Sequence, residues 1–257
     1  MSMSNYTTKQ MKLPVDSLVF GSYQRSIKQA EVNKIVKSFD KRLMRPIDVS
    51  YRGSKYYVLD GQHRVAALKK LGVATVEATV KYGMTEQEEA LFFVRNNDTA
   101  TSSAATSMQT GLAKFIAGDA EAQEIDREVR AAGLVIAYDG IKRAHSVAKY
   151  PPLIQAHKRG NLIQTLVIID SAFDGAPSSF QSTLITNVSR LINSAIVQVD
   201  PDHLVKALNK LGLEGFLRAI TRQQIMTAAQ RTEAMKVVIA DTYNKRLPES
   251  KKIPARW

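Results

Sequence analysis

Five consecutive residues, Asp60-Gly61-Gln62-His63-Arg64, separate an apolar strand-like segment from an amphipathic helix-like segment. A helix that starts just after a short glycine loop presents free backbone N–H groups and the positive end of its dipole. Gly61 would let the backbone approach a phosphate closely, and Arg64 can form a bidentate pair with phosphate oxygens. The loop therefore predicts an anion site.

The other three side chains of this loop could add chemistry to anion binding. His63 can donate a hydrogen bond to phosphate or act as an acid/base group near neutral pH. Gln62 could donate to a base or a sugar, and Asp60 could hold Mg²⁺ through water. The structural alternative is that Asp60 caps the helix while Gly61 makes a tight turn, and both interpretations can hold together. Neither GxxxxGK[ST] nor GxGxxG occurs in the chain, so the loop is neither a P-loop nor a Rossmann fingerprint.

The composition favours an anionic partner. The chain has 257 residues and a formal net charge of +12, with the 44% hydrophobic and 23% charged residues of an ordinary globular protein. Such a charge is most often found in proteins that bind nucleic acid, although a merely soluble basic protein is the alternative. The chain contains no cysteine, which excludes disulfides, zinc–thiolate sites, iron–sulfur ligation and cysteine nucleophiles.

No segment indicates a membrane or an export signal. The longest apolar run, "LIQTLVIID", is far shorter than the ~20 residues of a membrane span. The first residues, "MSMSNYTTKQMKL", lack the apolar core of a signal peptide. We therefore expect a cytoplasmic protein that does not associate with membranes.

Hydrophobic periodicity predicts alternating strands and helices in the first hundred residues. A strand is expected over residues 13–20, with residues 1–12 outside the fold, and a hairpin is expected around Gly53-Ser54. The loop at Gly61 leads into a helix that ends at Gly72, and residues 73–82 have the composition of a strand. Thr85 and Glu88 have the spacing of a capping box at the start of the next helix.

Beyond residue 100 the signals are almost all helical. The segment 207–222 has a helix–turn–helix rhythm around Gly212, which is common in helical domains of any function. We therefore predict an α+β fold in which an α/β domain over residues 13–100 precedes an all-helical domain over residues 101–247. A basic tail, residues 248–257, would complete the chain.

The loop and its neighbours resemble one family. "YYVLDGQHRVAALKKLG" resembles the phosphate-binding segment of the ParB/sulfiredoxin superfamily, in which a glycine, two polar residues and an arginine join a strand to an alanine-rich helix. Upstream, Gln24 and Arg25 in "YQRS" are similar to the family's Q-x-R segment, and "MRPIDVS" resembles its next strand. Downstream, "EEALFFVRNND" resembles the helix that ends in the ENxxR motif. The resemblance covers residues 13–100 in the family's order.

The resemblance implies a compact α/β nucleotide-binding domain. Within that family, ParB proteins bind CTP and slide on DNA as clamps, so the expected cofactor is a nucleoside triphosphate, ATP or CTP, with Mg²⁺. The residues carried over as phosphate-binding or flanking are Gly61, Gln62, His63, Arg64, Gln24, Arg25 and Asn96. Asp60 or Asn96 would help to place the metal ion. As a whole the chain most resembles two-domain ParB-like proteins of phages, plasmids and actinobacteria.

The chain departs from the family pattern in two motifs, and these departures bear on which ligand and which reaction are expected. ParB proteins carry GERR where this chain has Gly61-Gln62-His63-Arg64, and their helix-end motif begins with Glu where Arg95 stands here. These differences leave the choice of nucleotide open. Sulfiredoxin activity is excluded, because its nucleophilic cysteine corresponds to Gln62.

Three functions follow as hypotheses. The first is a nucleotide-dependent DNA-binding protein of a phage or mobile element, and it could form a homodimer. The second is an enzyme on the same fold, an NTPase, DNA nuclease or small-molecule kinase, with His63 or Asp60 as the acid/base group. Because DndB-like regulators also carry the DGQHR string, the enzyme could belong to DNA modification. The third is a partner-binding protein in which the loop has lost its function.

Basic residues of the second half are candidates for contacting the DNA backbone. The candidates are Lys142, Arg143, Lys158 and Arg159, together with Lys251 and Lys252 in the tail. A solvated helix face is the alternative for the first four. For the tail, the alternative is that Trp257 docks on its own domain.

Overall fold

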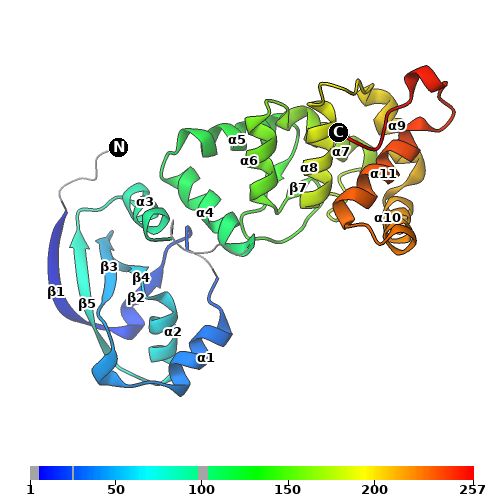
Figure 1. Cartoon of the computed structure of the whole chain (residues 1–257). Coiled ribbons are helices and arrows are strands. Elements are labelled where there is room, and N and C mark those ends of the chain that lie inside the picture. The colour runs from blue at the N-terminus through cyan, green and yellow to red at the C-terminus, as the bar shows by residue number, and fades with distance from the viewer. Residues whose placement is uncertain (1–5, 25, 98–103) are drawn as a thin grey trace. The chain divides into compact units, whose positions relative to one another are not determined.

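A computed structural model of the chain describes residues 6–24, 26–97 and 104–257. Its contacts divide the chain into two compact units, residues 1–122 and 123–257 (Figure 1). The domain boundary predicted at residue 100 lies outside the described residues. The predicted fold class is confirmed, since a mixed sheet with helices is followed by a mainly helical unit.

The first unit is built on a five-stranded sheet in the order β1-β5-β3-β4-β2. The strands are β1 (Thr7–Pro14), β2 (Leu18–Phe20), β3 (Ile47–Arg52), β4 (Lys55–Asp60) and β5 (Thr75–Tyr82). β2 pairs with β4, and β3 with β5, in parallel; β1 pairs with β5, and β3 with β4, antiparallel. The predicted hairpin is confirmed, because Gly53 and Ser54 both take positive φ angles, 54° and 62°, in the β3–β4 turn.

The beginning of the chain differs from the sequence-based expectation. β1 begins at Thr7, within the segment expected to lie outside the fold, and the strand expected over residues 13–20 is interrupted by a 3₁₀ turn, Val15–Ser17. β1 and β2 thus pair at opposite edges of the sheet. The side chains of β1 are mostly exposed. Its pairing depends on backbone hydrogen bonds, which hydrophobic alternation does not reveal.

Four helices accompany the sheet: α1 (Gln29–Lys37), α2 (Gln62–Lys70), α3 (Glu86–Asn97) and α4 (Ala104–Ile116). α1 lies beside α2 (Figure 1). Val65 and Leu68 of α2 join a buried core with Ile47, Val49 and Val58 of the sheet. Before α3, the predicted capping box is confirmed: Thr85 N–H donates to Glu88 Oε2 at 2.8 Å, and Glu88 N–H donates to Thr85 Oγ1 at 3.3 Å.

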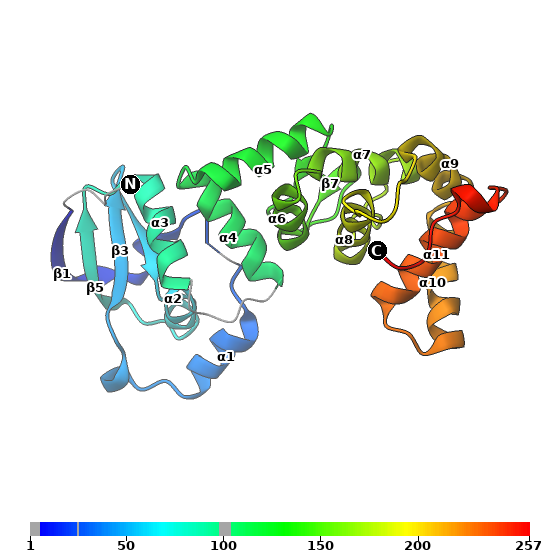
Figure 2. The ribbon, with the colours of Figure 1, turned by 45° about the horizontal axis from the view of Figure 1, so that its top comes forward.

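The second unit is mainly helical (Figure 2). Its elements, beginning with a helix that starts just before the division, are α5 (Ala120–Ala131), β6 (Val135–Ile136), β7 (Ser146–Val147), α6 (Tyr150–Lys158), α7 (Leu162–Phe173), α8 (Ser182–Ile192), α9 (Pro201–Leu211), α10 (Leu213–Thr227) and α11 (Arg231–Asn244). β6 and β7 form a short parallel pair that the all-helical prediction did not contain. α9 and α10 meet at Gly212, as predicted. Within the described part of the chain, no helix is long and apolar enough to cross a membrane.

A buried carboxylate ties α3 to the sheet. The Glu89 residue is 0% exposed, and Arg52 donates to both of its oxygens, at 3.1 Å and 3.2 Å. The hydroxyl of Tyr23 donates to Glu89 Oε2 at 3.2 Å. Burial, followed by the charge of Glu89, raises the pKa of Tyr23 far above its usual range, so this hydroxyl remains a donor. Because Tyr23 precedes Gln24, the network holds the loop after β2.

We expect Glu89→Ala to destabilise the first unit strongly. The substitution leaves the Arg52 guanidinium and the Tyr23 hydroxyl without their acceptor, and breaking a buried pair in this way costs about 3–5 kcal/mol. Urea unfolding monitored by circular dichroism measures the loss. The matched control is Glu86→Ala, because Glu86 is half-exposed and reaches Arg52 only at 3.8 Å; it should cost less than about 1 kcal/mol. Equal losses for the two variants would contradict the role given to Glu89.

Candidate functional site

The pairing of the strands brings three loops to one edge of the sheet. β2 and β4 are parallel neighbours, so the loops that follow Phe20 and Asp60 leave the sheet at the same edge. β3 runs antiparallel to β4, which brings Arg45 and Pro46, just before β3, to that edge as well. The DGQHR loop and the loop that carries Gln24 are therefore neighbours, although they are distant in sequence.

Gly61 makes the turn from β4 into α2 and has a backbone that only glycine adopts readily. Its φ is 96°, and a Cβ there would lie 2.8 Å from Ile47 Cγ2 and 3.0 Å from a guanidinium nitrogen of Arg64. Gly61 is the N-cap residue of α2, and no side chain caps the helix. The positive end of the α2 dipole is therefore not neutralised by a capping carboxylate.

Asp60 does not cap the helix; the proposed capping role is wrong, because its carboxylate turns to Arg64. Arg64 Nη2 donates to Asp60 Oδ2 at 2.7 Å. Arg64 Nη1 donates to the carbonyl oxygens of Arg45, at 2.9 Å, and Pro46, at 3.0 Å. The guanidinium is thus fixed at the start of α2, and Asp60 is the one charged group that it contacts in the described part of the chain.

Two glutamine side chains lie buried beside the turn. Gln24 and Gln62 are each 8% exposed. Gln24 Nε2 donates a short hydrogen bond to the carbonyl of Val58 in β4. That bond fixes the orientation of the amide, because the opposite orientation would place two acceptor oxygens together. Gln24 Oε1 is then left buried without a hydrogen-bond partner.

These residues line one cavity of about 210 Å³. Its walls are Gln24, Leu59, Asp60, Gly61, Gln62, His63, Arg64, Phe93 and Asn96. The structure thus brings together every predicted nucleotide-binding residue except Arg25, which lies outside the described residues. Sequence reasoning missed Phe93 as a wall residue. The signal was available, since Phe93 stands three positions before Asn96 on α3 and so shares its helix face.

The residues predicted as acid/base groups both make protein contacts. The backbone N–H of Lys28 lies 3.2 Å from His63 Nε2, which accepts its hydrogen bond. In the neutral ring the proton is then on Nδ1. Asp60 is held by Arg64, although its side chain is 58% exposed.

The donor set fits a metal ion only as a companion of a phosphate ligand. Among the described residues, no group of three or more histidine or acidic side chains could hold a metal ion. Mg²⁺ in nucleotide sites is commonly bound through one or two carboxylates, waters and the phosphates themselves. Asp60 could supply one such carboxylate, and Asn96 an amide oxygen.

The basic residues predicted to contact DNA differ in their surroundings. Arg143 is paired with Asp139 at 2.5 Å, and this ion pair lowers the pKa of Asp139. Lys142 and Lys158 are exposed, while Arg159 is half-buried at the end of α6. Lys252 is paired with Glu249 at 2.7 Å.

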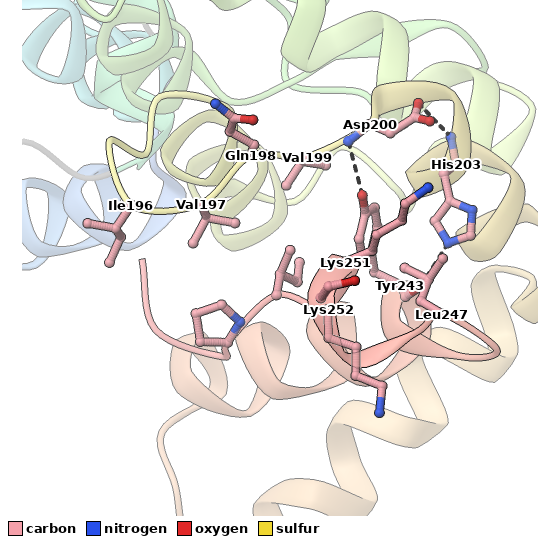
Figure 3. Close-up of a pocket in the computed structure, with 13 residues that line it drawn as sticks. Ile196, Val197, Gln198, Val199, Asp200, His203, Tyr243, Leu247, Lys251 and Lys252 are labelled. Atoms are coloured by element: carbon pink, nitrogen blue, oxygen red, sulfur yellow. Dashed lines mark hydrogen bonds between the residues drawn. The ribbon is translucent and has the colours of Figure 1, made fainter.

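The C-terminal tail docks on its own unit. Asn244 donates to the carbonyl of Ile253 and accepts from its N–H, both at 2.8 Å, and Ile253 is buried. Trp257 Nε1 donates to the carbonyl of Asn187 at 3.3 Å. Lys251 and Lys252 lie at a cavity of about 760 Å³ between this tail and the loop before α9 (Figure 3). The docking alternative for Trp257 is thereby confirmed.

Comparison with solved structures finds similar chains, of which three are described. Sulfiredoxin from Arabidopsis thaliana matches at 30% identity and a TM-score of 0.26, over 29% of this chain and 86% of that one. The C-terminally truncated chromosome-partitioning protein ParB from Caulobacter crescentus, complexed to the centromeric parS site, matches at 14% identity and a TM-score of 0.41, over 89% of this chain and 98% of that one. A Pnob8-like ParB-N domain matches at 16% identity and a TM-score of 0.39, over 95% and 97% of the two chains.

Comparison with curated protein sequences finds no match. The scan against family models gives one assignment that spans both units. Residues 20–250 match the model described as a family of unknown function, DUF6551. This range contains every wall residue of the cavity around Gly61 and all of α1 to α11. The chain therefore belongs to the DUF6551 family.

Proposed function

We propose that the chain is a nucleotide-dependent DNA-binding protein, of the kind that its sequence resembles in phages and plasmids. The phosphates of ATP or CTP bind in the cavity around Gly61, against the start of α2 and Arg64. The cavity measures about 210 Å³, below the ~300–1,000 Å³ of sites that enclose a whole small molecule. It therefore takes the phosphate end of the ligand, and the nucleoside extends past its rim.

The observation that carries the proposal is the unpartnered Gln24 Oε1. A buried acceptor without a donor is unfavourable, and the residue that carries this one lines the same cavity as an uncapped helix start and an arginine. A ligand that satisfies all three groups must present anionic oxygens together with a hydrogen-bond donor. A nucleotide does so through its phosphates and its sugar or base, whereas a fully deprotonated anion such as sulfate has no donor.

Binding of phosphate requires an exchange of partners at Arg64. Asp60 now occupies the guanidinium edge at 2.7 Å, and its carboxylate is a close analogue of a phosphate oxygen. When phosphate takes this place, the released Asp60 carboxylate becomes available to the Mg²⁺ that accompanies the nucleotide. Mg²⁺ would supply neutralisation of phosphate charge, with Asp60 or Asn96 as its protein ligand.

The positive charge of the chain supports the DNA half of the proposal. A net charge of +12 attracts a polyanion at long range, and each neutralised phosphate releases counterions. The contact of His63 favours binding over catalysis, because His63 Nε2 accepts a hydrogen bond from the backbone N–H of Lys28. Product formation with time would instead support the NTPase alternative.

The first test is a thermal-shift panel of ATP, CTP, GTP and ADP with Mg²⁺. A ligand that binds the folded chain raises Tm, and we expect a rise for ATP or CTP. Arg64→Ala should reduce affinity about tenfold or more, because it removes the charged donor that would replace Asp60 with phosphate as its partner. The matched control, Lys70→Ala, removes the same charge at the other end of α2, where Lys70 bonds Asn33. No shift with any nucleotide would rule out the proposed site.

The second test concerns Gln24. Gln24→Leu keeps the volume of the side chain but removes the free acceptor, so affinity for the nucleotide should fall about three- to tenfold. Affinity for tripolyphosphate, which lacks the sugar and base donors of a nucleotide, should change less. Isothermal titration calorimetry compares the two ligands. An equal loss for both would show that Gln24 does not recognise the nucleoside.

The third test concerns the exchange at Arg64. Asp60→Asn removes the competing charge, so without Mg²⁺ the variant should bind nucleotide several-fold more tightly than the wild type. The same substitution removes a metal ligand, so added Mg²⁺ should strengthen binding less than in the wild type. Titrations with and without Mg²⁺ measure both effects. Weaker binding of the variant in the absence of metal would contradict the exchange.

A further inference from the structure

Two arginines lie near each other at the ends of α6 and α8 in the second unit. Arg159 is the C-cap residue of α6, and Arg190 lies in the last turn of α8. The guanidinium of Arg159 donates to Ser189 Oγ at 3.4 Å, so it reaches the residue that precedes Arg190. Helices α6 and α8 pack against each other, which keeps the two positions together.

In the described part of the chain, neither of these arginines forms an ion pair with a carboxylate. Other arginines of this unit do so: Arg127 with Glu124, Arg130 with Asp126, Arg143 with Asp139 and Arg218 with Glu214. Burial, followed by the like charge of Arg190, lowers the pKa of Arg159. A half-buried cation beside a second cation is unfavourable by itself, and a bound anion would relieve it.

The start of α7 adds positive potential beside this pair. Asn161 occupies the N-cap position of this 12-residue helix but makes no side-chain cap. Its amide is turned to α8 instead, where Nδ2 donates to the Ser189 carbonyl and Oδ1 accepts from Ser189 Oγ, both at 2.8 Å. The uncapped helix start therefore lies beside the same residue, Ser189, that Arg159 contacts.

We infer that Arg159 and Arg190, together with the start of α7, bind a phosphate group of the DNA backbone. This inference rests on the DNA partner of the proposed function and assigns it a contact point. A backbone phosphate fits better than a free nucleotide, because Arg190 is exposed and contacts of charged groups with phosphates position a DNA backbone without reading its bases. Arg143 and Lys252 differ from Arg159, because each forms an ion pair within the chain, with Asp139 and Glu249 respectively.

Fluorescence anisotropy with the full chain and a labelled duplex of about 20 base pairs, with and without ATP or CTP and Mg²⁺, tests the site at several salt concentrations. Arg159→Ala and Arg190→Ala should each weaken binding several-fold. The double variant should lower the slope of log affinity against log salt by about one, as expected for one lost phosphate contact. Arg127→Ala is the matched control; it removes the same charge from an ion pair with Glu124 and should change affinity less than about twofold.

Thermal melting of each variant, and its Tm rise with nucleotide, separate this inference from misfolding and from the proposed nucleotide site. If both arginine variants bind DNA with the affinity and the salt slope of the wild type, the assigned contact point is wrong, while the DNA partner itself is not affected. A wild-type chain that binds no duplex at low salt, either with or without nucleotide, would overturn the DNA partner itself. Variants that keep the nucleotide response but lose DNA affinity would support the inference.

Discussion

A left-handed turn at Gly61 is the constraint on which the candidate site depends. Its φ of 96° redirects the chain from the end of β4 into α2, and the missing Cβ leaves room for Ile47 and for the guanidinium of Arg64. The turn thereby places the positive end of a helix at the edge where β2 and β4, parallel neighbours, both end. The loop after β2 then adds Gln24 to the same cavity.

A second interaction, the buried network around Glu89, helps to position the residues of the site. Glu89 accepts hydrogen bonds from Arg52 in the sheet and from Tyr23 in the loop after β2, so one carboxylate holds a helix, a strand and a loop. Tyr23 lies next to Gln24, and Phe93, one helical turn after Glu89, is a wall of the cavity. The site is therefore positioned by the core of the first unit, while its polar groups face the cavity.

The sequence contained the local features of this fold. The Gly53-Ser54 hairpin, the capping box of Thr85 and Glu88, and the glycine turn into α2 are each set by neighbouring residues, and all three are present. The contacts that it did not reveal join distant residues. Tyr23 and Glu89 are 66 positions apart, and no periodicity connects them. The pairing of β1 with β5 was missed for a related reason, because an exposed edge strand needs few apolar side chains.

Charge pairing also distinguished residues that looked equivalent in the sequence. Arg143 and Arg159 both stand in basic segments, yet one is paired with Asp139 and the other shares its surroundings with Arg190. Arg64 is held by Asp60. The sequence had suggested two roles for Asp60, a helix cap and a metal ligand, and did not reveal this ion pair.

The claim that phosphates bind at the start of α2 can be tested directly by ¹⁵N–¹H NMR of the full chain during titration with ATP or CTP and Mg²⁺. A hydrogen bond to phosphate moves an amide proton downfield, so we expect the largest shifts at Gly61, Gln62 and His63. Shifts confined to other parts of the chain, with these three amides unmoved at saturation, would contradict it.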